Sequence, residues 1–321
     1  MLEKRKIYWL SGLACLAAAF GFLGYYQHVG AFVRSPETKT LSYRVSTGVA
    51  WPSLNYPRRT TTADADNEYR DTMLGVVVEG TKGAVRFYPL SLLHWHEVIN
   101  DTLDGQPIAV TYSPLSGSVA VYARGEEDLY FASESLVNNI SVLQKQNDPH
   151  DFLQLNGAPV DGSADGLVSI PYTLMTWKAW KEIYAYGQVV WLHTDFDFDY
   201  ARTKYAYNYD VTSDVYYPYM FVDSDFDAKA IVYGVKTDDT QLLFAHDDLV
   251  AHNTLTHAAR MHGISGILEA TIDDVGTVRI VFIADDQESN QGSIVVAFVR
   301  TMAFAYLTLY PHAEHVVHLQ Q

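Results

Sequence analysis

The chain has 321 residues, is 48% hydrophobic and carries a formal net charge of -16 at pH 7. A chain of this length and hydrophobic content can bury a substantial core, which excludes a largely disordered protein. The negative charge repels phosphate backbones and argues against a nucleic-acid partner. The only cysteine is Cys15, so an internal disulfide and a cysteine-based metal site are excluded.

The N-terminal residues have the composition of a membrane anchor. Charged residues at 3–6 precede an apolar run from Ile7 to Tyr26 (residues 7–26), and a membrane-spanning helix needs about 20 apolar residues. Because positive charges precede the run, we expect a single-pass helix in the cytoplasmic membrane, with its N-terminus inside and the bulk of the chain in the periplasm or outside. A cleaved signal peptide and a lipid-modified Cys15 are the alternatives, but the apolar run continues past both processing positions.

The remainder of the chain predicts mainly short strands. Residues 34–70 are rich in proline, threonine and charge and predict an extended linker. From Met73 onward, short β-rich runs alternate with glycine-containing turns, while aromatic residues 177, 180 and 184 have the spacing of one helix face. In chain order we expect strands at 73–80 and 84–90, a helix at 91–101, strands at 107–113, 118–124, 128–134 and 141–146, a helix at 173–185, and a strand at 188–194.

The second part of the chain shows a weak internal repeat of the first. Residues 75–87 resemble 234–244, and the helix with its following strand at 177–190 resembles 304–317. The fold class is therefore a β-rich α+β protein with two weakly repeated strand-helix-strand units behind an N-terminal transmembrane helix. The expected division is a cytoplasmic tip and anchor at 1–33, a linker at 34–70, an exported β-rich domain with the first repeat at 71–215, and the second repeat at 216–321.

Two segments of the first repeat carry a family resemblance. The sequences YPLSLLHWHEVIND, residues 88–101, and TYSPLSGSVAVYAR, residues 111–124, resemble the bacterial and archaeal domain-of-unknown-function family 3179. Its members typically show an aromatic-Tyr-Pro-Leu strand, a His-Glu-Ile/Val-x-Asn-Asp segment and a Tyr-Cys-Pro-Leu-Cys-Gly loop. The matching positions are Tyr88, Pro89, Leu90, His96, Glu97, Asn100, Asp101, Tyr112, Pro114, Leu115 and Gly117. The resemblance covers roughly residues 70 to 220 and implies an architecture more than an activity.

One departure from the family pattern bears on chemistry. The two positions that are usually cysteine are Ser113 and Ser116 in this chain. Cysteine thiols can form a redox disulfide or bind a metal, whereas a serine hydroxyl stays protonated and is a poor ligand. We therefore expect that any thiol chemistry of the family is lost here, and that this loop is a structural turn.

The family segment has two chemical alternatives to a structural role. Ser113 or Ser116 with His96 and Asp101 could form a serine hydrolase, but the G-x-S-x-G pattern is absent. His96, Glu97 and Asp101 could bind a metal or another ligand, or could form a polar network with Asn100 that fixes the helix to the sheet. The family-motif cluster, as a binding site or a structural network, consists of Tyr88, His96, Glu97, Asn100, Asp101, Tyr112, Ser113 and Ser116.

Two further patterns lie outside the family segment. Asp195, Asp197 and Asp199 alternate with aromatic residues, and three carboxylates on one face could bind Ca²⁺, although the EF-hand loop is not matched. The alternative is a solvated strand edge with buried phenylalanines opposite. Apart from this possible Ca²⁺ ion, we expect no cofactor. A tyrosine-rich stretch suits a partner interface or packing over the domain's own core. Its interface candidates are Tyr205, Tyr207, Tyr209, Tyr216, Tyr217 and Tyr219.

Together these patterns predict a membrane-anchored, exported accessory or structural subunit. It would be non-catalytic and would dock onto a larger membrane protein complex, with residues 7–26 in the membrane. The alternative is a metal- or ligand-binding protein, possibly an enzyme, that uses the cluster of His96, Glu97 and Asp101.

Overall fold

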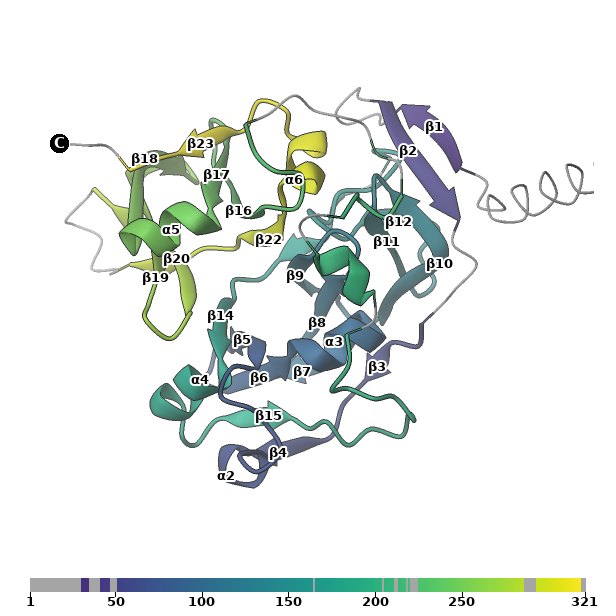
Figure 1. The fold of residues 1–321 in the computed structure, drawn as a ribbon, viewed down its shortest axis with the longest axis vertical. Coiled ribbons are helices and arrows are strands. Elements are labelled where there is room, and N and C mark those ends of the chain that lie inside the picture. The colour runs from purple at the N-terminus through teal and green to yellow at the C-terminus, as the bar shows by residue number, and fades with distance from the viewer. Residues whose placement is uncertain are drawn as a thin grey trace, which may run out of the picture.

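The structure is a computed structural model (Figure 1) that describes residues 30–34, 41–46, 51–163, 165–203, 205–210, 213–217, 219, 225–285 and 293–318. The expected anchor at residues 7–26 and Cys15 lie outside these ranges. Within them, no helix combines the length and the hydrophobicity that a membrane span requires. The β-rich α+β class is confirmed, since the described structure is built on three sheets and its longest helices have seven residues.

Sheet A is the smallest of the three sheets. Its strands, in spatial order, are β1 (Gly30–Arg34), β2 (Leu41–Ser46), β10 (Leu129–Val137), β11 (Ile140–Lys145) and β12 (Asp151–Leu153). It lies beside the other two sheets, to the right in Figure 1.

Sheets B and C are larger and share one element plan. Sheet B has the order β23 (Glu314–Val316), β17 (Gln241–Ala245), β16 (Ile231–Lys236), β22 (Val299–Met302), β9 (Ser118–Ala123), β8 (Gln106–Ser113), β7 (Val98–Leu103) and β3 (Leu54–Asn55), with β13 (Val168–Ser169) paired to β9. Sheet C has the order β18 (Thr254–Met261), β19 (Ile264–Ile272), β20 (Val278–Ala284), β14 (Thr173–Thr176), β5 (Leu74–Glu79), β6 (Val85–Pro89), β15 (Gln188–Val190) and β4 (Arg59–Thr61), with β21 (Ile294–Val295) paired to β20.

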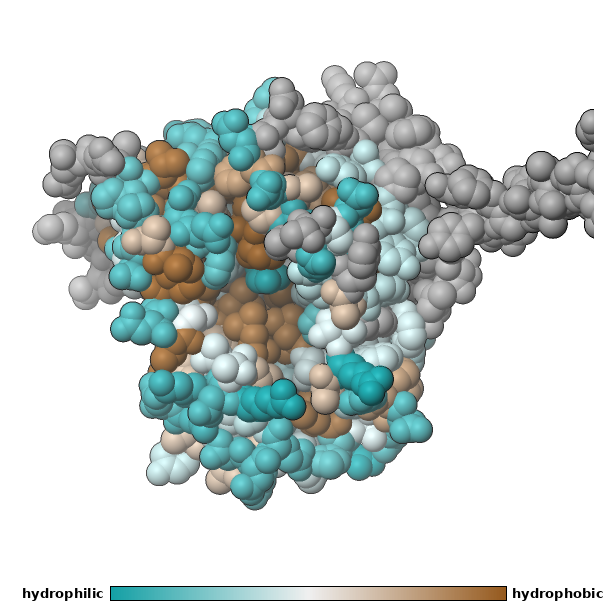
Figure 2. All heavy atoms as spheres, in the orientation of Figure 1, coloured by the Kyte–Doolittle hydropathy of each residue, from teal (hydrophilic) through white to brown (hydrophobic). Residues whose placement is uncertain are grey.

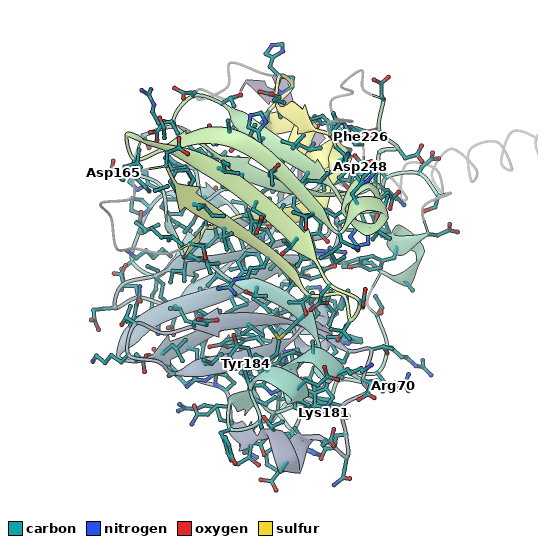
Figure 3. All side chains as sticks on the ribbon, turned by 90° about the vertical axis from the view of Figure 1, so that its left-hand side faces the viewer. Arg70, Asp165, Lys181, Tyr184, Phe226 and Asp248 are labelled. Carbon is teal, nitrogen blue, oxygen red and sulfur yellow. The ribbon has the colours of Figure 1, made fainter. Side chains whose placement is uncertain are left out.

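Short helices connect and cover these strands. They are α2 (Thr62–Ala65), α3 (Leu90–His96), α4 (Trp177–Ile183), α5 (His246–His252), α6 (Ala303–Leu309) and a 3-10 turn at Ala206–Tyr209. In Figure 3, Lys181 and Tyr184 mark α4 near the lower end of the molecule, and Phe226 and Asp248 lie toward the opposite end.

The order of elements is duplicated along the chain. The first repeat runs β5–β6–α3–β7–β8–β9 and, after an interval, β14–α4–β15; the second runs β16–β17–α5–β18–β19–β20 and then β22–α6–β23. The pairings repeat too, including the antiparallel β5–β6 and β16–β17 hairpins and the parallel β6–β15 and β17–β23 pairs. Helices α3 and α5 both end at a left-handed residue, Glu97 at φ 61° and Asn253 at φ 60°. The predicted boundary between residues 215 and 216 falls in the segment between β15 and β16 and stays a prediction.

The two repeats exchange strands. Strand β9 of the first repeat pairs with β22 of the second, through Val119 and Arg300. In the equivalent position β20 of the second repeat pairs with β14 of the first, through Val278 and Leu174. Sheets B and C are therefore each built from both repeats, and the main hydrophobic core combines side chains from both sheets. Helices α4 and α6 each pack on a separate core at equivalent places.

Local backbone signals explain where the elements differ from expectation. The helix expected at 91–101 ends at His96, because Glu97 takes the left-handed conformation and residues 98–103 continue as β7. The helix expected at 173–185 begins only at Trp177, because the Thr176 side chain caps it after strand β14. The linker expected at 34–70 contains, in its described part, β2, β3, β4 and the capped helix α2.

Candidate functional site

The family-motif cluster does not form one site in the structure. Asp101 is buried and forms an ion pair with Arg86, the two side chains being 4% and 3% exposed. The Tyr88 hydroxyl donates to Asp101 Oδ2 over 3.0 Å, and burial, followed by the Asp101 charge, raises the pKa of Tyr88. This group joins β6 to β7, and the buried Asp101 charge is balanced by the Arg86 charge within the fold.

His96 and Asn100 fasten neighbouring segments to the same region. His96 Nδ1 lies 2.9 Å from the Pro52 carbonyl oxygen, so this nitrogen donates and the other nitrogen, Nε2, accepts from the Tyr200 hydroxyl at 2.7 Å. The Asn100 side chain donates to the Leu129 carbonyl and accepts from the Leu129 N–H. The structure thus assigns these two residues positioning roles.

The metal interpretations gain no support from the described residues. Within this part of the chain, no group of three or more His, Cys, Asp or Glu side chains could hold a metal ion. His96, Glu97 and Asp101 are close in sequence, but Asp101 pairs with Arg86 while both His96 nitrogens bond to Pro52 and Tyr200.

The aspartate run lies in a loop and not on the expected strand edge. Asp195 pairs with Arg58 at 2.7 Å and Asp199 with Arg202 at 3.1 Å. Phe196 and Phe198, which alternate with these acids, stack on one another with ring centroids 5.8 Å apart. Asp197 is exposed, and the three carboxylates are not gathered into a cation site.

The Ser-Pro-Leu-Ser loop is a buried, fully bonded turn. Ser113 Oγ accepts from the Ser141 hydroxyl at 2.8 Å, and Ser116 Oγ lies 2.7 Å from Ser118 Oγ. The Asn208 side chain donates to the Pro114 and Leu115 carbonyls, both at 3.0 Å. Because His96 bonds elsewhere, neither serine has it as a general base.

The tyrosines of the expected interface divide into two groups. The Tyr209 hydroxyl lies 2.8 Å from that of Tyr112 and 3.3 Å from His94 Nδ1, facing the interior. Tyr205, Tyr216 and Tyr217 form a chain of edge-to-face ring contacts. Tyr219 packs on Phe304 of α6, and the side chain of Tyr207 lies outside the described residues.

A cavity is lined by residues of the linker and the first repeat, between positions 68 and 209, and by Arg300 of the second repeat. Figure 2 shows that this face of the molecule is hollowed near its centre, with hydrophobic residues at the bottom of the hollow. The elements around this centre in Figure 1, namely β5, α3, β8 and β22, line a cavity of about 570 Å³. This volume falls in the range of roughly 300 to 1,000 Å³ that is usual for small-molecule sites.

Arg300 is the cation on the inner side of this cavity. It extends from β22, is half-buried, and donates from Nη1 to the Gly117 carbonyl oxygen at 2.7 Å. Among the described residues Arg300 forms no ion pair. Ser91 also contributes to the cavity lining, although its Oγ is closed off from solvent and has no hydrogen-bond partner in the described structure.

The duplicated fold provides an internal comparison for these residues. Across the core-facing side of sheet B, directly paired positions form the row Tyr112, Val119, Arg300, Tyr233 and Phe244. The equivalent row across sheet C is Ile272, Val278, Leu174, Val76 and Tyr88. Thus Leu174 stands where the other repeat has Arg300, and Ile272 stands where it has Tyr112. Since the same backbone plan is built with aliphatic residues at these positions, packing alone does not require Arg300 and Tyr112.

The electrostatics place the Arg300 charge near several phenol and imidazole groups. Burial raises the pKa of the Tyr112 and Tyr209 hydroxyls, and the Arg300 charge offsets part of this rise. Burial also lowers the pKa of His246, and Arg300 lowers it further. The two tyrosines therefore stay protonated at neutral pH and can donate hydrogen bonds.

The sequence names Tyr112 and Tyr209 as candidate residues but gives no local signal for Arg300. Arg300 comes from a strand that follows Gly117 by 183 residues, and the two are joined by a hydrogen bond. An alignment of the two repeats gives Arg300 and Leu174 equivalent positions. That difference between the repeats could have identified Arg300.

The fold and the cavity define the class: a duplicated, strand-exchanged β-rich α+β protein with a cavity lined mainly by its first repeat and by Arg300 of the second. The model of the protein-of-unknown-function family 3179 matches residues 50–312. The chain therefore belongs to that family. No curated protein and no solved structure matches it.

Proposed function

We propose that this chain is a non-catalytic binding protein that holds a small anionic molecule in the cavity beside Arg300. The observation that carries the proposal is Arg300, a half-buried guanidinium without a carboxylate partner among the described residues. A charge removed from water is costly unless it is paired. The equivalent position in sheet C holds Leu174, so a ligand that pairs with Arg300 explains why a charge is kept there.

Two features of the cavity wall support the same proposal. Tyr112 and Tyr209 present protonated hydroxyls beside His94. These groups can donate to an anion. At the rim, Arg70 and Arg202 are exposed, and Figure 3 shows Arg70 at the edge of the molecule. Because Glu68 also lines the cavity and Arg202 pairs with Asp199, Arg70 is the rim charge that favours the approach of an anion.

Thermal unfolding in the presence of small anions tests this proposal. At constant ionic strength, a panel of carboxylates and oxyanions should include members that raise the Tm of the native chain, since binding to the folded state stabilises it. Arg300→Leu, which copies the residue of the other repeat, should abolish these shifts. Arg279→Leu is the matched control, because Arg279 is an exposed strand residue that does not line the cavity. Equal Tm shifts in the native chain and Arg300→Leu would contradict the proposal.

A second candidate function is the accessory subunit of a membrane protein complex. The observation that favours it is the aromatic chain of Tyr205, Tyr216 and Tyr217, in which Tyr216 is 46% exposed. Tyrosines suit interfaces because they bury area while keeping a polar hydroxyl. The apolar run at residues 7–26 would keep this surface beside membrane partners.

Site-specific photo-crosslinking tests the second candidate. A photoreactive phenylalanine at position 216 in the full-length chain should crosslink to a specific membrane protein. The control position is Tyr186, which is fully exposed at 102% and lies outside this aromatic chain. A monomeric chain in gentle detergent, with no crosslinked partner from position 216, argues against the accessory role.

A further inference from the structure

The side chains that line the cavity indicate which kind of anion binds there. This inference rests on the binding function proposed above. Arg300 uses Nη1 for the Gly117 carbonyl. Its Nε and Nη2 groups have no hydrogen-bond partner among the described residues. These N–H groups form one edge of the planar guanidinium, and that edge matches the two oxygens of a carboxylate.

The single positive charge of Arg300 suits a ligand group that carries one negative charge. Arg300 is flanked along its sheet row by Tyr233 and, beyond Val119, by Tyr112. The nearby donors, the Tyr112 and Tyr209 hydroxyls, are neutral, and the charge of Glu97, which acts on both tyrosines, further disfavours a dianion. A phosphate dianion is usually met by several cations or by a row of backbone N–H groups. A single guanidinium surrounded by neutral donors suits a monoanion better.

The remainder of the cavity is largely apolar. Met73, Leu74, Leu90 and Leu192 contribute to its lining, and Figure 2 shows hydrophobic residues at the bottom of the central hollow. The rim arginines are not placed for a second fixed contact, because Arg202 already pairs with Asp199 and Arg70 is exposed at the edge of the molecule. The remainder of a bound ligand therefore contacts apolar side chains.

We infer that the ligand is a monocarboxylate with an apolar body, such as an aryl or medium-chain alkyl acid. Its carboxylate lies on the free edge of Arg300, within reach of the tyrosine hydroxyls. Its body extends along Leu74, Leu90 and Leu192 and so contacts the first repeat, while its head is held by the second. Both parts of such a molecule contribute to affinity, and neither suffices alone.

Isothermal titration of the full chain with four probes tests the inference. Octanoate and benzoate carry head and body, acetate carries only the head, and 1-octanol carries only the body. We expect octanoate or benzoate to bind at least ten-fold more tightly than acetate, and 1-octanol to show no dependence on Arg300. Arg300→Lys keeps the charge but loses the planar edge, and should weaken octanoate binding about ten-fold or more.

A variant of the cavity wall separates the contribution of the body. Leu192→Asn should weaken octanoate binding by at least five-fold and leave acetate binding unchanged. Ile183→Asn is the matched control, because Ile183 is 56% exposed on α4 and does not line the cavity.

The outcomes distinguish this inference from the binding function on which it rests. If acetate, phosphate or sulfate binds as tightly as octanoate, and does so through Arg300, the inference fails and the anion-binding function stands. If no anion, including phosphate, binds in an Arg300-dependent manner, both fail. If octanoate binds equally to the native chain, to Arg300→Lys and to Leu192→Asn, it binds elsewhere and the inference is overturned.

Discussion

At the scale of single residues, the polar groups of this chain serve two distinct purposes. Arg86, Asp101, Asn100 and the serines of the Ser-Pro-Leu-Ser loop are buried with partners that the fold itself supplies. Their loss would leave buried polar atoms unsatisfied, at a cost of about 1–3 kcal/mol each. Arg300 differs, because it is only half-buried and forms no ion pair among the described residues. That difference separates scaffold from candidate site more clearly than the family motif does.

His246 provides a prediction of pH dependence at this scale. It lies 2.9 Å from the Tyr233 hydroxyl through Nδ1, and burial, followed by the Arg300 charge, lowers its pKa. A histidine whose folded pKa is lowered contributes stability that is fully present above the unfolded pKa of about 6.5. That stability is lost as the pH falls from this value toward the folded pKa.

We therefore expect the free energy of unfolding to decline more steeply below about pH 6.5 in the native chain than in His246→Gln. Urea unfolding at a series of pH values measures this slope. His312→Gln, at an exposed position, is the control and should keep the native slope. Identical pH profiles for the native chain and His246→Gln would count against the assignment.

At the scale of elements, the sequence predicts what is local and misses what is long-range. The 79–83 turn between strands and the aromatic helix at Trp177 follow from spacing and turn residues alone. The end of α3 at His96 was missed because the left-handed conformation of Glu97 is set by the backbone, and glutamate carries no strong signal for it. Arg300 was missed as a site residue because its neighbours come from β8 and β9, which the sequence does not place beside β22.

The two aromatic helices illustrate how equivalent elements reach the same packing by different residues. In the second repeat the ring of Tyr306 on α6 lies against Gly234 of β16, so closely that a Cβ at Gly234 would overlap it. In the first repeat the equivalent strand position is Val77 of β5, and the ring of Trp180 on α4 lies instead against Gly187. Each repeat therefore has a glycine at the position where the aromatic ring approaches the backbone.

Gly234→Val, which copies the first repeat, should destabilise the chain by about 1–3 kcal/mol or more through overpacking. Chemical denaturation measures this change. In the double variant with Tyr306→Leu, the ring is removed, and the valine should cost much less than it does in the native background. Strict additivity of the two substitutions would show that the ring contact does not cause the loss.

At the scale of the whole molecule, exchange of strands makes the repeats interdependent. Sheet B needs β16, β17, β22 and β23 from the second repeat, and sheet C needs β18, β19 and β20. Neither repeat can bury its share of the common core without the other. The two repeats are for this reason expected to unfold together.

Expressing the chain as two fragments, cut at the predicted boundary between residues 215 and 216, tests this dependence. Each fragment alone should lack a cooperative unfolding transition, because β9 and β14 lose their strand partners. Mixing the fragments should restore one transition and the anion-dependent Tm shifts. Circular dichroism melts of the separate and mixed fragments measure this, and cooperative melting of either fragment alone would contradict it.

The hydrogen bond from the Thr301 hydroxyl to the Ser116 carbonyl spans 185 residues. It can form only after nearly the whole chain has been synthesised. During synthesis the first repeat emerges long before β22 and β20 exist, with two sheet edges open to unwanted pairing. Closure waits for the last strands to be made, so we expect slow folding for a chain of this size. A nascent chain of this kind gains most from a chaperone that covers strand edges until translation ends.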